Sequence, residues 1–166
     1  FEYCESLESL DLSSFDTSSV TTMNSLFKNC KSLISIDLSN FNTFNVKNMS
    51  SMFESCLSLQ TIYINGVNNF ITGNVNNMEN MFKNCRNLTR VDIKFDTHNV
   101  ENMRSMFENC ESLISLDTPN FNTTKVKDMF KMFSNCKSLE QLDTSKFSLK
   151  EVQNVTRMFE NCQNLS

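Results

Sequence analysis

Turn-forming residues are scarce in this sequence, which has two glycines, one proline and no tryptophan in 166 residues. Globular domains ordinarily contain about 7% Gly and about 5% Pro, much of it at turns, so other residues must make the turns here. The chain contains no apolar run of the roughly 18 residues that can span a bilayer, and no charged-then-apolar leader is visible. A basic surplus is also missing, because 15 Lys and Arg against 19 Asp and Glu give a net charge of −4. This balance argues against nucleic acid as a partner, since phosphate binding needs clustered cations.

The sequence does contain a repeat, which its seven cysteines mark. Successive cysteines are separated by 26, 26, 29, 25, 26 and 26 residues. A period between about 20 and 50 residues indicates a repeat architecture. We therefore expect one repeat domain over residues 1–166, a fragment of a longer solenoid. Its predicted units are partial repeats at 1–3 and 162–166 and full repeats at 4–29, 30–55, 56–84, 85–109, 110–135 and 136–161.

Each repeat combines two periodicities. Residues 35–39 alternate polar and apolar side chains, which predicts a short half-buried strand. Val46, Met49, Met52 and Phe53 then follow at steps of 3, 3 and 1, which predicts the apolar stripe of a helix. Neither element can cover its apolar face alone, so stacked repeats should form an α/β solenoid with parallel strands on one side and helices on the other.

Asparagine is the residue expected to end each helix. Asn29, Asn84, Asn109, Asn135 and Asn161 directly precede a cysteine, and Ser55 holds the same position in its repeat. Asn is the non-glycine residue best suited to the left-handed conformation that ends a helix. This choice explains how the chain can turn with so little glycine.

The recurring pattern C-x-x-L-x-x-[LIV]-x-[LI], preceded by M-F-x-x-C, resembles the BspA-like branch of the leucine-rich repeat superfamily over essentially the whole chain. The resemblance implies a leucine-rich-repeat-like, right-handed solenoid with one short parallel strand and one helix per repeat. It also implies a cell-surface or secreted adhesin-like protein that binds a host or matrix protein. Function belongs to particular sites and not to a fold, so the residues must be considered separately.

The cysteines allow three interpretations: disulfides, a metal site, or a buried apolar ladder. The ladder is favoured, because equivalent cysteines in adjacent repeats single out no pair and free Cys is commonly buried. The only histidine, His98, is expected in an exposed turn, far from any metal-binding cysteine pair. We predict no metal, no cofactor and no catalytic residues, and hence a protein that is not an enzyme.

The outward side of the strands is the predicted binding face. Its residues are expected to be Asp11, Asp37, Tyr63, Arg90, Asp92, Asp117 and Asp143. This row suits a basic or amide-rich protein partner or a line of Ca²⁺ ions, or else it is a solvated face whose Asp residues cap turns. The longer third repeat adds a second candidate, the loop at 65–73, which is either a binding insertion or a tolerated one.

These features predict a non-enzymatic protein-binding module of a cell-surface or secreted adhesin-like protein. Two alternatives stay open: a structural subunit whose copies stack end to end into a fibre or surface layer, and an intracellular repeat scaffold. The expected partner is a protein ligand or another copy of the chain, with neither nucleic acid nor a membrane-spanning segment involved.

Overall fold

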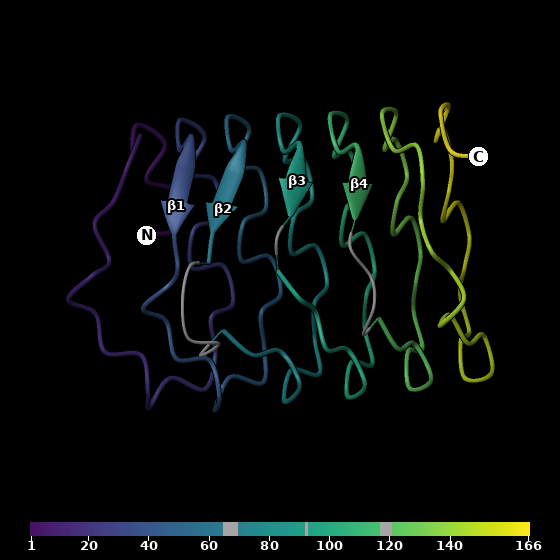
Figure 1. The fold of residues 1–166 in the computed structure, drawn as a ribbon, viewed down its shortest axis with the longest axis horizontal. Coiled ribbons are helices and arrows are strands. Elements are labelled where there is room, and N and C mark those ends of the chain that lie inside the picture. The colour runs from purple at the N-terminus through teal and green to yellow at the C-terminus, as the bar shows by residue number, and fades with distance from the viewer. Residues whose placement is uncertain (65–69, 92, 117–120) are drawn as a thin grey trace.

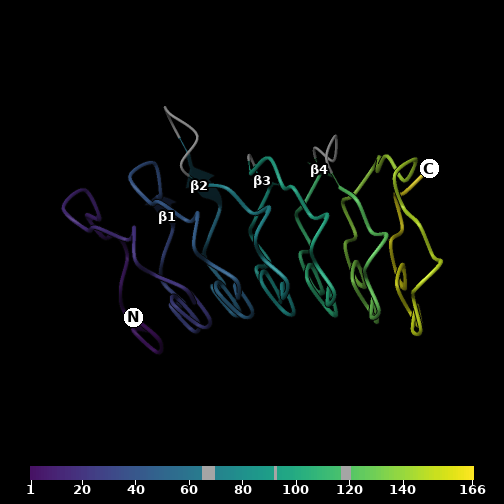
Figure 2. The ribbon, with the colours of Figure 1, turned by 90° about the horizontal axis from the view of Figure 1, so that it is seen from below.

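The computed structural model describes residues 1–64, 70–91, 93–116 and 121–166 as a stack of coils (Figure 1). The coils follow one another in sequence order, and the two termini lie at opposite ends of the stack in both views (Figure 2). Each coil has a front leg, which carries the strand where one forms, and a back leg, which returns the chain to the next coil. In the second repeat the front leg includes β1 and the back leg includes residues 49–56. The predicted repeat solenoid is therefore confirmed.

Four short strands lie in a row along the front legs (Figure 1). They are β1 (Ser35–Asp37), β2 (Thr61–Tyr63), β3 (Arg90–Val91) and β4 (Ser115–Leu116). β1 pairs with β2 and β3 pairs with β4, both in parallel, with Ile36 opposite Ile62 and Val91 opposite Leu116. The predicted parallel strands are thus confirmed in four repeats. Residues 8–13 form no strand, and in the sixth repeat the strand position is marked by a parallel bridge between Ser115 and Gln141.

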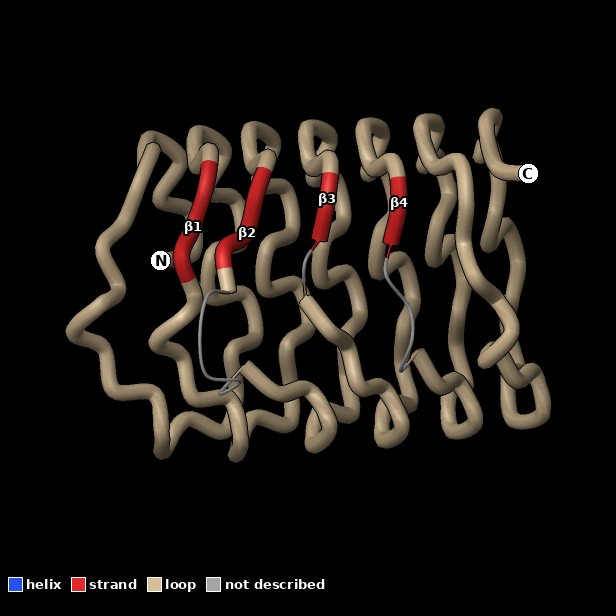
Figure 3. Tube along the Cα trace, in the orientation of Figure 1, coloured by secondary structure: helices blue, strands red, loops and turns tan. Residues whose placement is uncertain are grey.

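The predicted helix is wrong, since the described residues contain no helix (Figure 3). The back leg of the second repeat is a series of turns, in which the amide of Met52 donates to the carbonyl of Met49 and that of Cys56 to Phe53. Ser51 and Ser55, at the third positions of these turns, have φ of 56° and 62°. A right-handed helix requires negative φ at every residue, so these residues exclude it.

Hydrogen bonds to the next coil explain why turns replace the helix. Alternate back-leg amides of the second repeat point along the stack, where a helix would use them internally. They donate to carbonyls of the third repeat over 2.7–3.0 Å, in the pairs Met49 to Asn77, Ser51 to Glu79, Phe53 to Met81 and Ser55 to Lys83. Apolar residues spaced three apart fit a helix and a series of turns equally well, because the first and last residues of a β-turn are also three apart.

The left-handed conformation predicted before each cysteine is confirmed. Asn29, Ser55, Asn84, Asn109, Asn135 and Asn161 have φ between 59° and 63°. Their side chains also join the coils, since the amide nitrogen of Asn109 donates to the side-chain oxygen of Asn84 at 2.7 Å, and that of Asn135 to Asn109 at 2.7 Å. Asparagine therefore both permits the turn and links adjacent repeats.

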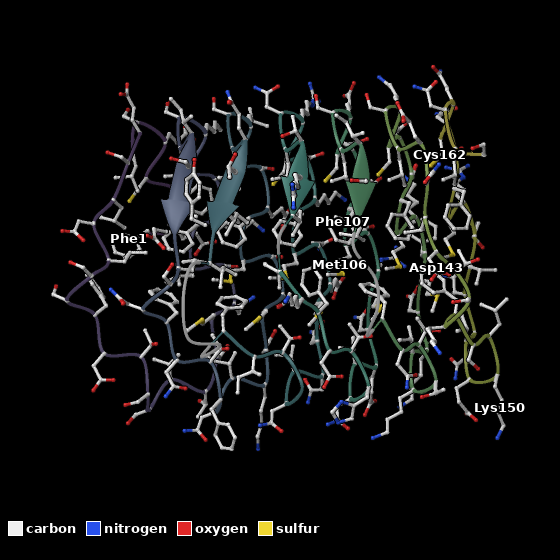
Figure 4. All side chains as sticks on the ribbon, viewed as in Figure 1. Phe1, Met106, Phe107, Asp143, Lys150 and Cys162 are labelled. Atoms are coloured by element: carbon white, nitrogen blue, oxygen red, sulfur yellow. The ribbon has the colours of Figure 1, made fainter. Side chains whose placement is uncertain are left out.

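The core lies between the two legs and is built from ladders of identical side chains (Figure 4). Leu33, Ile36 and Leu38 enter it from the front leg, and Met49 and Met52 enter it from the back leg, all 2% exposed or less. A phenylalanine ladder runs along the stack with ring centroids 5.3–5.5 Å apart, through Phe27, Phe53, Phe82, Phe107 and Phe133. Each repeat thus completes its core only against its neighbours.

Candidate binding face of the solenoid

Most residues of the predicted binding face lie at the surface of the front legs. Asp11, Asp37, Tyr63, Arg90 and Asp143 are exposed. Asp37 ends β1 and pairs directly with Tyr63, which ends β2 and has 46% of its surface exposed. Asp92, Asp117 and part of the 65–73 loop, residues 65–69, lie outside the described residues.

The three described aspartates of this face cap turns. One carboxylate oxygen of Asp11 accepts the amide of Ser13 at 2.9 Å, and the same bond joins Asp37 to Ser39 at 2.9 Å and Asp143 to Ser145 at 2.8 Å. The bond from the backbone amide lowers the pKa of Asp11 and of Asp143. Asp11 and Asp143 therefore keep their negative charge at neutral pH while they fix the local backbone.

Two exposed isoleucines extend the face beyond the predicted residues. Ile34 directly precedes β1 and Ile114 directly precedes β4, and they are 47% and 49% exposed. The sequence carries a signal that could have identified them, because the same repeat position holds the polar residues Glu8, Gln60, Thr89 and Glu140 elsewhere. With Tyr63 they place apolar surface among the charges of the face.

The cysteines form a buried ladder, as predicted for five of them. All seven are free; Cys30, Cys56, Cys85, Cys110 and Cys136 are buried, whereas Cys4 is exposed. Each of the five buried thiols donates to a phenylalanine carbonyl of the preceding coil, for example Cys56 to Phe27 at 3.0 Å and Cys85 to Phe53 at 3.1 Å. Burial raises the pKa of Cys56 to about 12 and also raises the pKa of Cys85 well above its usual value. Such thiols are poor nucleophiles and poor metal ligands.

His98 lies in an exposed turn, as predicted, and both of its ring nitrogens have partners. Nδ1 lies 2.7 Å from a carboxylate oxygen of Asp96, and Nε2 lies 2.8 Å from the side-chain nitrogen of Asn99. The Asn99 amide is oriented by Gly73, whose carbonyl accepts from that nitrogen, and by Lys125, which donates to its oxygen. Nε2 is therefore an acceptor and Nδ1 carries the proton, so neither nitrogen is available to a substrate.

The described residues hold neither a cluster of metal ligands nor a membrane-spanning helix. No three His, Cys, Asp or Glu side chains in the described ranges converge as metal ligands. No helix of the described chain is long and apolar enough to cross a membrane.

Solved structures give distant likenesses. A leucine-rich repeat protein from Bacteroides ovatus is 18% identical, with 74% of this chain and 34% of that one covered and a TM-score of 0.40. A leucine-rich cell surface protein from Faecalibacterium prausnitzii is 16% identical, with 100% and 73% covered and a TM-score of 0.27. TLR13 in its complex with ssRNA13 is 13% identical, with 86% and 30% covered and a TM-score of 0.28. This chain thus spans about a third of the Bacteroides protein.

Sequence comparison identifies the family. A search of the curated proteins finds no match. A family model described as "Mycoplasma protein of unknown function, DUF285" matches residues 1–65 and 60–166, which together cover the whole chain. The chain therefore belongs to the DUF285 family.

Proposed function

We propose that this chain is a non-enzymatic, protein-binding module of a BspA-like, adhesin-like protein at the cell surface or secreted. The observation that carries the proposal is the exposed Tyr63 on the paired strands β1 and β2. Tyr is enriched at binding hot spots because it offers a large rigid contact area with a polar end. The localisation rests on the family resemblance of the repeat pattern.

The charges around Tyr63 suit a basic or amide-rich protein ligand. Asp11, Asp37 and Asp143 keep the front legs negative, and the whole chain has a net charge of −4. Such charges mainly accelerate association and set register, whereas the apolar contacts of Tyr63 and Ile34 supply affinity. A negatively charged face of this kind repels nucleic acid phosphates.

A non-enzymatic role agrees with the state of the most reactive side chains. Both nitrogens of His98 are bound within its own turn, and the buried thiols have raised pKa values. The only histidine of the chain and its buried thiols are thus engaged in the scaffold.

Surface plasmon resonance tests the proposal with fibronectin, fibrinogen, laminin and collagen immobilised in turn. We expect one of them to bind, with affinity weakened about 30-fold by Tyr63→Ala, a loss of about 2 kcal/mol. Phe44→Ala is the matched control, since Phe44 is 58% exposed but lies outside the strand face.

The proposal fails if none of the four proteins binds, or if both variants bind as the parent does. Concentration-dependent assembly that Tyr63→Ala leaves unchanged, seen by light scattering without binding to the four proteins, would favour the self-stacking subunit instead.

A further inference from the structure

A second candidate site lies away from the strand face, at the edge where the front legs turn into the back legs. Lys150 marks this edge in Figure 4. An open groove of about 710 Å³ occupies it over the fourth to sixth repeats. Its walls include Asp96, His98, Asn122, Thr124, Lys146 and Phe147.

The repeat register places an acceptor beside a donor in this groove. Asp96 and Asn122 hold the same position in adjacent repeats, each directly before the buried Thr97 or Thr123. Equivalent residues on paired coils are about 4.8 Å apart, which is the spacing of adjacent strands. A carboxylate and a carboxamide therefore follow one another along the floor of the groove.

Both side chains keep hydrogen-bonding capacity for a ligand. Oδ1 of Asp96 takes both contacts with His98, and within the described chain no hydrogen bond reaches Oδ2. Oδ1 of Asn122 accepts the amide of Thr124 at 2.9 Å, while its side-chain nitrogen donates to no described residue. The groove thus offers a charged acceptor and a neutral donor side by side.

Gly73 leaves the free oxygen of Asp96 open. A Cβ at position 73 would lie 3.1 Å from Oδ2 of Asp96 and 3.4 Å from Cε1 of His98. The equivalent position carries a side chain in the other repeats, for example Phe44 and Thr124. One of the two glycines of the chain therefore stands where a side chain would crowd this carboxylate.

Backbone amides and carbonyls along the groove already have hydrogen-bond partners, which disfavours binding of an extended peptide. The hydroxyl of Thr72 both donates to the carbonyl of Asp96 at 2.9 Å and accepts its amide at 2.8 Å. The hydroxyl of Thr97 donates to the carbonyl of Asn122 at 2.8 Å. A peptide that adds as a strand needs such main-chain groups unpaired. A phosphate is disfavoured as well, because the Asp96 carboxylate would repel it.

We propose that this groove binds a neutral saccharide. The free carboxylate oxygen of Asp96 accepts one sugar hydroxyl, and the carboxamide nitrogen of Asn122 donates to the next. Phe147, which stacks on Phe121 with centroids 5.7 Å apart, offers its remaining surface to the apolar C–H face of the ring. Neutral hydroxyls satisfy an acceptor and a donor together without adding charge beside Asp96.

NMR titration of the ¹⁵N-labelled chain tests this site with the methyl glycosides of glucose, galactose, mannose and N-acetylglucosamine. We expect at least one glycoside to shift the amides around Asp96 and Asn122. Asp96→Asn should weaken binding about tenfold, the loss expected for one hydrogen bond to a charged acceptor. Gly73→Ala should weaken it too, without a change of charge.

Asp16→Asn is the matched control, because Asp16 holds the same repeat position and accepts the amide of Ser18 at 2.9 Å, yet lies outside the groove. It should bind like the parent, and so should Tyr63→Ala, which separates this site from the strand face. The proposal is overturned if no glycoside shifts these amides, if Asp96→Asn and Gly73→Ala both bind normally, or if inorganic phosphate alone produces the shifts.

Discussion

The hydroxyl of Thr43 donates to the carbonyl of Ile71 at 2.7 Å and accepts the amide of the same residue at 2.7 Å. Thr43 is fully buried and belongs to the second repeat, whereas Ile71 belongs to the third. The same reciprocal bond joins further coils, in the pairs Thr17 with Asn42, Thr72 with Asp96 and Thr123 with Ser148. In each of these four repeats one side chain thus supplies a backbone-like connection where the chain leaves the front leg.

Thr43→Val should destabilise the chain because it keeps the volume of the side chain but removes the hydroxyl. The amide and the carbonyl of Ile71 would both lose this partner, at a cost of about 1–3 kcal/mol for each group left unsatisfied. Chemical denaturation measures the loss, and hydrogen exchange at Ile71 should accelerate. Thr21→Val is the control, since Thr21 is exposed. An unchanged unfolding midpoint for Thr43→Val would show that water replaces the hydroxyl.

Met49→Asp should unfold the chain. Met49 is fully buried between the two legs, and an unpaired carboxylate there should cost several kcal/mol. Leu38→Asp should act in the same way from the front leg, where Leu38 is also fully buried. Lys47→Asp places the same charge on an exposed neighbour and should leave the melting temperature almost unchanged. A cooperative melt of Met49→Asp near that of the parent would contradict the assigned core.

The five buried thiols should react with a thiol reagent only after denaturation. Burial raises the pKa of Cys56 to about 12, so the reactive thiolate is almost absent at neutral pH. Cys4 is exposed and Cys162 is half-buried, and these two should react in the native protein. Mass spectrometry after a brief native labelling measures the sites. Rapid labelling of Cys85, or a disulfide between Cys30 and Cys56, would refute the ladder.

Glu108 should make stability depend on pH in the acid range. Burial acts to raise its pKa, but the ammonium groups of Lys131 and Lys83, each 2.9 Å away, outweigh burial and lower it. Its contribution is therefore complete above the usual pKa of 4.5 and is lost as the pH falls through the lower folded-state value. Glu108→Gln should be less stable than the parent at about pH 7, and the difference should shrink as the pH falls through the folded-state pKa of Glu108. A stability difference that stays constant over this range would exclude the role.

The sequence predicted those parts of the structure that depend on one repeat alone. Alternation at residues 35–39 identified β1, and the asparagine before five of the cysteines identified a left-handed turn. The position of Tyr63 on the outward side also followed from alternation. Partners on the next coil could not be predicted, because the repeat pattern says which residues recur but not which atoms meet.

For that reason a helix was wrongly predicted and the groove was not predicted at all. A step of three residues fits both a helix and a chain of turns, and the bonds between coils decide in favour of turns. The open carboxylate oxygen of Asp96 depends on Gly73, which stands beside it in the preceding repeat. The spacing within a single repeat does not reveal whether Gly73 contacts Asp96 or simply belongs to a long loop without a role.

Asn80 provides a direct test of the turns in the back leg. Its φ is 55°, so it occupies the left-handed region, where a Cβ costs roughly 1–2 kcal/mol and Asn is tolerated better than Ala. Asn80→Ala should therefore lower the free energy of unfolding by about 1 kcal/mol, and Asn80→Gly should leave it equal or higher. In a helix the order would be reversed, because Ala is the best helix former and Gly is among the worst. Asn76→Ala, at an exposed position without positive φ, is the control and should change little. Chemical denaturation of the three variants measures their free energies of unfolding. A higher value for Asn80→Ala together with a lower value for Asn80→Gly would contradict the turns and support a helix in the back leg.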